Sequence, residues 1–187
     1  MSEKKITEIL EQQQEGLTKY VGTISSDHAY IHQGKGKISI VEAGSISASY
    51  KIGFKTPKVA SGKYVHWRPV GLFSDADTVK YRLYEDNAYT GGTANDIETL
   101  NRNLNGVTLS QMQDVKKGVT ATLTGELIQL IRAGSTGNPS ARSGGGAGAD
   151  EERLLLPDTD YVVEILPGGA TNVDVELFWY EENGYQG

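Results

Sequence analysis

The stretch VKYRLYEDNAYTGGTANDIETLNRNLN, residues 79–105, decides the fold class. Val79, Tyr81 and Leu83 alternate with polar residues, which is the period of a half-buried β-strand. A turn-prone passage rich in glycine follows, and the stretch ends on a polar segment in which Arg102 lies between two asparagines. No acid, base or nucleophile accompanies Arg102 at a spacing typical of a reaction centre. We therefore interpret this arginine as a structural clamp or a contact residue.

Strand-like alternation recurs on both sides of this stretch. Its clearest example is ISASYKIGF, residues 46–54, where apolar and polar side chains alternate without a break. Pro69 follows another such segment and predicts that its strand ends at an edge or a bulge. The remaining predicted strands cover residues 37–40, 64–67, 79–84, 119–123, 127–131, 154–156, 161–165 and 173–179.

The pattern amounts to about nine or ten short strands separated by turn signals, with no helical crossovers between them. The ten tyrosines and 23 glycines fit this pattern, because aromatic residues favour strands and glycine favours turns. We predict a mostly-β fold, an antiparallel β-sandwich or jelly roll, rather than an α/β fold.

A short amphipathic helix is predicted at the N-terminus, with Ser2 as its cap. Its apolar stripe consists of Ile6, Ile9, Leu10 and Leu17. So short a helix is marginal in isolation and needs a surface on which to lie. It either packs on its own domain or docks as an arm on another subunit, and both alternatives stay open.

The chain divides into an arm and one β-domain. We assign residues 1–19 to the helical arm and residues 20–187 to the β-sandwich domain. Within that domain, residues 134–150 read GSTGNPSARSGGGAGAD. This segment lacks the Gly-Lys-Ser/Thr ending of a phosphate-binding loop and the strand-then-helix context that such a loop needs. It predicts a flexible surface loop.

The composition argues against several classes of function. A net charge of −6 argues against sequence-independent nucleic-acid binding and against an anionic membrane surface as partner. The absence of cysteine excludes disulfides and thiolate metal sites. The chain has no run of about 18 apolar residues, and its N-terminus lacks the apolar core of a signal peptide. We expect synthesis in a cytoplasm and release by a route other than secretion.

A metal site is the first alternative that the histidines raise. His28 and His32 are four residues apart, a spacing that would place both on one helical face. No HExxH glutamate accompanies them, nearby glycines argue against a long helix, and His66 is the only other histidine. We interpret the histidines as hydrogen-bonding residues and expect neither a metal nor a cofactor.

Paired carboxylates are the second alternative. Asp160 and Glu164 share one strand face, as do Asp174 and Glu176, and such pairs hydrolyse glycosides in other proteins. Because Asp174 and Glu176 alternate with apolar residues, we expect them on the solvated face of the last strand. No GxSxG elbow occurs either. We predict that the protein is not an enzyme.

Several short motifs together resemble a known class of protein. They are SDHAYIHQGKG at 26–36, YRLYE at 81–85, LNRNLN at 100–105, EERLLL at 151–156 and VELFWYEE at 175–182. In this order they resemble the small β-sandwich virion proteins encoded among the head genes of tailed bacteriophages. The resemblance spans roughly residues 20–182, and the N-terminal helix is not part of it.

The resemblance implies a capsid decoration protein, also called a cement or auxiliary head protein. Such proteins are non-enzymatic, bind the major capsid protein on the capsid exterior after assembly in the host cytoplasm, and are commonly trimers. The polar segments 20–36 and 134–150 would then be contact surfaces or an exposed knob. We expect partner contacts at Ile6, Ile9, Leu10, Leu17, Tyr20, His28, Tyr30, His32 and Arg102.

A soluble β-domain of unrelated function stays open as an alternative, and so do two other kinds of phage structural protein. One is a tail or baseplate component that binds a host surface glycan, because β-sandwiches with exposed aromatic residues also suit sugar stacking. It requires exposed aromatic residues clustered in one groove, with Tyr84, Tyr89, Tyr180 and Tyr185 as candidates. The other is a head–tail connector or tail-terminator protein, which requires a ring oligomer.

Overall fold

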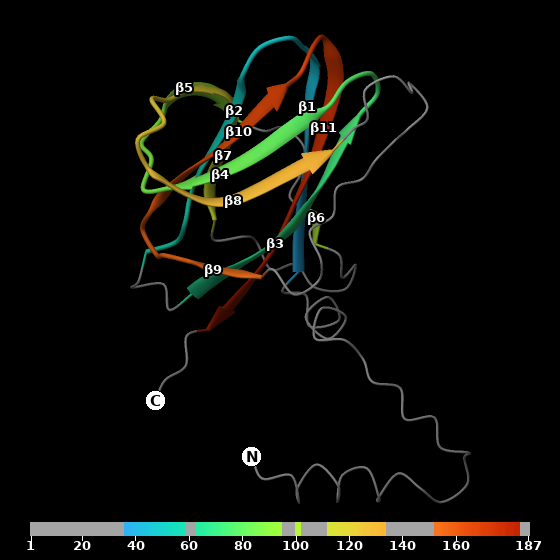
Figure 1. Cartoon of the computed structure of the whole chain (residues 1–187). Coiled ribbons are helices and arrows are strands. Elements are labelled where there is room, and N and C mark those ends of the chain that lie inside the picture. The colour runs from blue at the N-terminus through green and yellow to red at the C-terminus, as the bar shows by residue number, and fades with distance from the viewer. Residues whose placement is uncertain (1–35, 59–62, 95–99, 102–111, 134–151, 184–187) are drawn as a thin grey trace, which may run out of the picture.

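A computed structural model describes residues 36–58, 63–94, 100–101, 112–133 and 152–183. These residues form eleven strands and no helix, arranged as two antiparallel sheets that lie as layers (Figure 1). The mostly-β, antiparallel sandwich predicted from the sequence is confirmed, with one strand more than the upper expectation. The predicted N-terminal helix and the segment 134–150 lie outside the described residues.

The first sheet has five strands in the order β6-β1-β11-β3-β9. Their bounds are Leu100–Asn101 for β6, Gly36–Ile46 for β1, Thr171–Asn183 for β11, Lys63–Ser74 for β3 and Arg153–Leu155 for β9. The long pair β11 and β3 forms its centre. Every pairing in this sheet is antiparallel.

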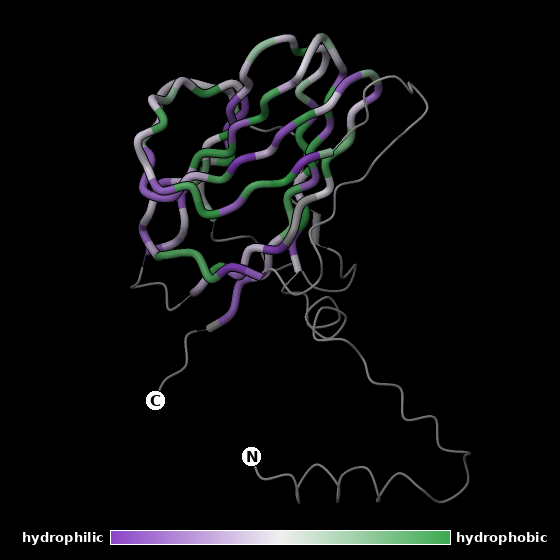
Figure 2. Tube along the Cα trace, viewed as in Figure 1, coloured by the Kyte–Doolittle hydropathy of each residue, from purple (hydrophilic) through white to green (hydrophobic). Residues whose placement is uncertain are grey.

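The second sheet has six strands in the order β5-β7-β2-β10-β4-β8. Their bounds are Thr90–Ala94 for β5, Gln113–Thr120 for β7, Tyr50–Lys55 for β2, Asp160–Pro167 for β10, Val79–Glu85 for β4 and Glu126–Ala133 for β8. All pairings are again antiparallel. Figure 2 shows apolar residues alternating with polar ones along the strands, as a two-layer sandwich requires.

Four aromatic rings join the two sheets across the core. Phe54 of the six-stranded sheet stacks on Trp67 of the five-stranded sheet, with ring centroids 4.8 Å apart. Tyr161 extends this stack on one side at 5.3 Å, and Trp179 on the other at 6.3 Å. All four side chains are fully buried. Burial of such large rings is a main source of stability in a sandwich of this size.

One predicted strand is in fact two. The alternation over residues 46–54 crosses a connection: Ile46 ends β1 in the five-stranded sheet, and Tyr50 begins β2 in the six-stranded sheet. The link consists of Ser47, Ala48 and Ser49, all exposed. Because these small residues continue the apolar–polar alternation, nothing in the sequence indicates that the chain changes sheets here. The prediction of an unbroken strand was therefore wrong.

The strand before Pro69 continues beyond it. β3 runs on to Ser74, and Pro69 and Val70 together oppose the single residue Leu177 of β11. This two-against-one arrangement is a β-bulge, which tolerates a residue without a backbone N–H. The bulge that Pro69 predicted is confirmed, but the end of the strand predicted there is wrong. The strand predicted at 119–123 also lies earlier, at Gln113–Thr120, because Lys116 and Lys117 hide its alternation.

Candidate functional site

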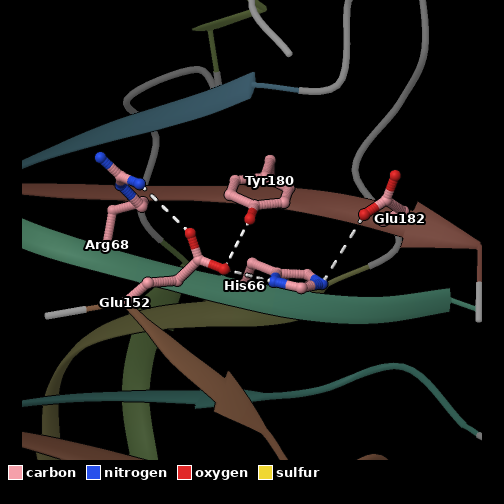
Figure 3. Close-up of polar contacts among 5 residues, drawn as sticks. All are labelled: His66, Arg68, Glu152, Tyr180 and Glu182. Atoms are coloured by element: carbon pink, nitrogen blue, oxygen red, sulfur yellow. Dashed lines mark hydrogen bonds and ion pairs between the residues drawn. The ribbon is translucent and has the colours of Figure 1, made fainter. Parts of the chain in front are cut away.

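A polar cluster holds the short edge strand β9 against the centre of the five-stranded sheet (Figure 3). Its five residues, which we call the β9 clamp, are His66, Arg68, Glu152, Tyr180 and Glu182. Strand pairing sets their positions. His66 on β3 is opposite Tyr180 on β11, and on its other side it is opposite Leu154 on β9. Glu152 immediately precedes β9 and points back over β3.

Glu152 is the hub of the clamp. One of its carboxylate oxygens accepts hydrogen bonds from the Tyr180 hydroxyl at 2.6 Å and from Nδ1 of His66 at 2.7 Å. The other oxygen accepts one from the Arg68 guanidinium at 3.2 Å. The carboxylate therefore ties the start of β9 to both central strands at once. Hydrogen bonds to a charged group of this kind are stronger than those between neutral groups.

The imidazole of His66 contacts three other residues of the clamp. Its ring stacks on the ring of Tyr180, with centroids 4.4 Å apart and planes at 12°. Nδ1 contacts Glu152, and Nε2 lies 4.0 Å from a carboxylate oxygen of Glu182. A carboxylate thus faces each ring nitrogen. This arrangement orients the ring.

The electrostatics of the clamp favour an ionised Glu152. Partial burial alone would raise the pKa of this carboxyl, but hydrogen bonds to it outweigh burial. The bond from Tyr180 contributes most, followed by those from His66 and Arg68. The net result is a pKa of Glu152 below its ordinary range. At neutral pH the clamp is therefore centred on an ionised Glu152 carboxylate.

The other end of β9 is also anchored. The backbone N–H of Leu156 donates to the Tyr161 hydroxyl oxygen at 2.8 Å, and its carbonyl accepts from the Thr56 hydroxyl at 2.6 Å. The Tyr161 hydroxyl in turn donates to Glu85 at 2.6 Å. Burial raises the pKa of Tyr161, and the bond to Glu85 raises it further, so the hydroxyl stays protonated. Both ends of β9 are thus fixed to strands of the sandwich.

β9 and the residue directly after it present apolar side chains to solvent. Leu155 is buried in the core, with 1% of its surface exposed, whereas Leu154 is 58% exposed and Leu156 is 53% exposed. We call these two exposed residues the leucine edge. Among the described residues β9 pairs with β3 alone, so it is an edge strand within that part of the chain. A rigid edge with exposed leucines is suited to binding another protein.

The structure does not place the contact residues that the sequence predicted. Ile6, Ile9, Leu10, Leu17, Tyr20, His28, Tyr30, His32 and Arg102 all lie outside the described residues. Among the described residues, no group of three or more His, Asp or Glu side chains could hold a metal ion. Of the three histidines only His66 is described, and its ring nitrogens face carboxylates.

The carboxylates considered for glycoside chemistry lie on two different sheets. Asp160 and Glu164 belong to β10, whereas Asp174 and Glu176 belong to β11. Asp174 is exposed between buried valines, which confirms the solvated face predicted for that strand. Glu164 is buried instead, 6% exposed, and it contacts Arg82 at 3.3 Å. The structure thus does not bring the two pairs together.

The four tyrosines of the glycan hypothesis do not form one group. Tyr180 is 3% exposed and stacks on His66 in the five-stranded sheet. Tyr84 is half-buried on β4 of the six-stranded sheet. Tyr89 precedes β5, where its ring covers Gly53 of β2. Tyr185 lies outside the described residues.

The leucine edge and Glu152 were not among the residues predicted from the sequence. One signal was present: EERLLL contains three consecutive leucines, and neighbouring residues on a strand face opposite sides. At least one leucine of such a triplet must point away from the core. The partners of Glu152 gave no signal, because strand pairing alone brings them together.

Comparison of the chain with protein-family models, with curated proteins and with solved structures found no match. The described residues contain no helix long and apolar enough to cross a membrane.

Proposed function

We propose that this protein is a non-enzymatic virion component that binds the outer surface of a bacteriophage capsid and stabilises it, as decoration proteins do. In this proposal its partner is the major capsid protein, and the bound form is a homo-oligomer, with a trimer favoured. The observation that carries the proposal is the leucine edge. Leu154 on β9 and Leu156 directly after it are each more than half exposed, and both ends of this strand are anchored.

The sequence resemblance to phage head proteins supports the same reading. One of its motifs, EERLLL, spans residues 151–156 and includes both leucines of the edge. A preorganised apolar edge binds at little cost in conformational entropy, because its backbone is already ordered. Many modest contacts on a capsid lattice add up through avidity. A protein of this kind therefore needs a binding edge but no reaction centre.

Cosedimentation with phage heads tests this proposal. Heads assembled without the protein are mixed with the wild type, with Leu154→Ser and with Leu156→Ser, and the bound fraction is measured by centrifugation. Burying one leucine contributes about 1.5 kcal/mol or more, so each substitution should weaken binding roughly tenfold. Leu127→Ser is the matched control, because Leu127 is 46% exposed but lies on β8 of the other sheet.

The outcomes separate the alternatives. Wild-type protein that stays in the supernatant at every concentration would overturn the capsid proposal. Binding that Leu154→Ser and Leu156→Ser leave unchanged would overturn the leucine edge as the contact. Retention of the wild type on a column of host surface glycan, without binding to heads, would favour the tail or baseplate alternative.

A further inference from the structure

Each outer face of the sandwich carries two like charges that lie opposite each other on neighbouring strands. On the six-stranded sheet, Lys80 of β4 is directly opposite Arg132 of β8. On the five-stranded sheet, Glu42 of β1 is directly opposite Asp174 of β11. We call them the cationic pair and the anionic pair. All four residues are exposed, and the neighbours of each along its strand lie in or against the core, so the four side chains point outward.

Neither pair is compensated within the described part of the chain. Among the described residues, none of the four side chains belongs to an ion pair. Like charges directly opposite on neighbouring strands destabilise a sheet. Two such pairs, one of each sign and on opposite faces, therefore cost stability in the isolated protein. Each would become favourable against a surface of the other sign.

The surroundings of the two pairs are complementary in other respects. Beside the cationic pair, Leu130 points outward on β8 and is 47% exposed. Beside the anionic pair lies a hollow of about 290 Å³, and Phe73 forms part of its wall. The hollow is lined by Phe73, Ser74, Asp75, Asn172 and Asp174. An opposing apolar side chain can bury itself against Phe73 while the charges pair around it.

More charges of the same sign extend each face. Lys51 of β2 points outward on the six-stranded sheet, as does Lys116 of β7, which is opposite Gly53. The carboxylate of Glu164 on that face is already bound to Arg82. On the five-stranded sheet, Glu176 occupies the next outward position after Asp174. A chain with a net charge of −6 thus carries one basic face and one acidic face.

We propose that two copies of this chain dock face to face, with the cationic pair of one copy on the anionic pair of the next. The occupant of each face is a second copy, because the chain itself carries the complementary surface in charge and in shape. The contact is heterologous, since it joins two different patches, and it can repeat from copy to copy. This inference goes beyond the proposed function and does not depend on it.

Sedimentation velocity of the purified full chain tests the contact at two salt concentrations. At about 0.1 M salt we expect the average mass to rise with protein concentration. At about 1 M salt, where exposed charges are screened beyond roughly 3 Å, we expect the rise to disappear. Wild-type protein whose mass does not change with concentration at low salt would overturn the proposal.

Charge reversal makes the test specific to the two pairs. Lys80→Glu places an opposite charge beside Arg132, and Asp174→Lys does the same beside Glu42, so each variant gains a favourable pair within the chain. We expect their melting temperatures to hold or rise while self-association weakens tenfold or more. The matched control is Arg153→Glu. Arg153 is exposed on β9, away from both pairs, and its substitution changes the net charge as Lys80→Glu does. This control should associate like the wild type.

Mixing two double variants tests whether self-association is restored when the charges are complementary again. Lys80→Glu/Arg132→Glu presents acidic pairs on both faces, and Glu42→Lys/Asp174→Lys presents basic pairs on both. Each double variant alone should fail to associate, whereas an equimolar mixture should associate again. A mixture that stays dissociated, or a double variant that associates alone like the wild type, would overturn the proposed contact.

Discussion

At the scale of single residues, Glu152 organises the candidate site. It accepts three hydrogen bonds, from the side chains of Tyr180, His66 and Arg68, and so connects an edge strand to two central strands. These three partners are 28, 86 and 84 residues away along the chain. No local motif brings them together, which explains why the sequence alone did not predict the clamp.

The pH dependence of stability follows from the lowered pKa of Glu152. A carboxyl whose folded pKa lies below its unfolded value stabilises the fold fully above the unfolded pKa, near 4.3, and loses this contribution as the pH falls through the folded pKa. We expect Glu152→Gln to lower the free energy of unfolding by about 1 kcal/mol near pH 7. The difference from wild type should shrink toward about pH 3.

Urea denaturation at the two pH values measures this effect. Glu126→Gln is the control, because Glu126 is an exposed glutamate at the start of β8. A loss in Glu152→Gln that is equally large at both pH values would contradict an ionised Glu152 as the hub of the clamp.

At the scale of elements, β9 combines a buried side with an exposed one within three residues. Leu155 is 1% exposed in the core, and its neighbour Leu154 is 58% exposed. The strand is therefore held by one apolar anchor and two polar anchors. The strand is thus ordered in the free protein, unlike an edge that becomes ordered only on binding.

Two substitutions on β9 separate these roles. Leu155→Ala removes a buried side chain and should lower the free energy of unfolding by about 3 kcal/mol. Leu154→Ala changes an exposed one and should lower it by less than about 0.5 kcal/mol. Thermal or chemical denaturation gives both values. Equal losses in the two variants would contradict the burial pattern of the strand.

Strand periodicity predicted most elements, and its failures have physical causes. The alternation of Val79, Tyr81 and Leu83 located β4, because one face of that strand is buried and the other solvated. The same rule joined Ile46, the last residue of β1, to β2, since the link between the strands continues the alternation. It also misplaced β7, where Lys116 and Lys117 occupy neighbouring strand positions. A period shows which residues share a face but not which strands become neighbours.

At the scale of the whole molecule, the sandwich carries surfaces of different chemical character. The outer face of the five-stranded sheet is acidic around Glu42 and Asp174, and its edge strand carries the leucine edge. The outer face of the six-stranded sheet is basic around Lys80 and Arg132. In the two proposals, the charged faces serve self-association and the leucine edge serves a capsid partner. The proposed function rests on the leucine edge, and the charged faces are independent of it.

The most direct test of the central claim is the melting temperature of phage heads with and without bound protein. A ligand that binds only the assembled state stabilises it by RT ln(1 + [L]/Kd), about 2.7 kcal/mol at a hundredfold excess over Kd. We predict that saturating wild-type protein raises the temperature at which heads release their contents, and that Leu154→Ser shifts the required concentration roughly tenfold upward. A head melting temperature that is the same with and without saturating protein would contradict the claim.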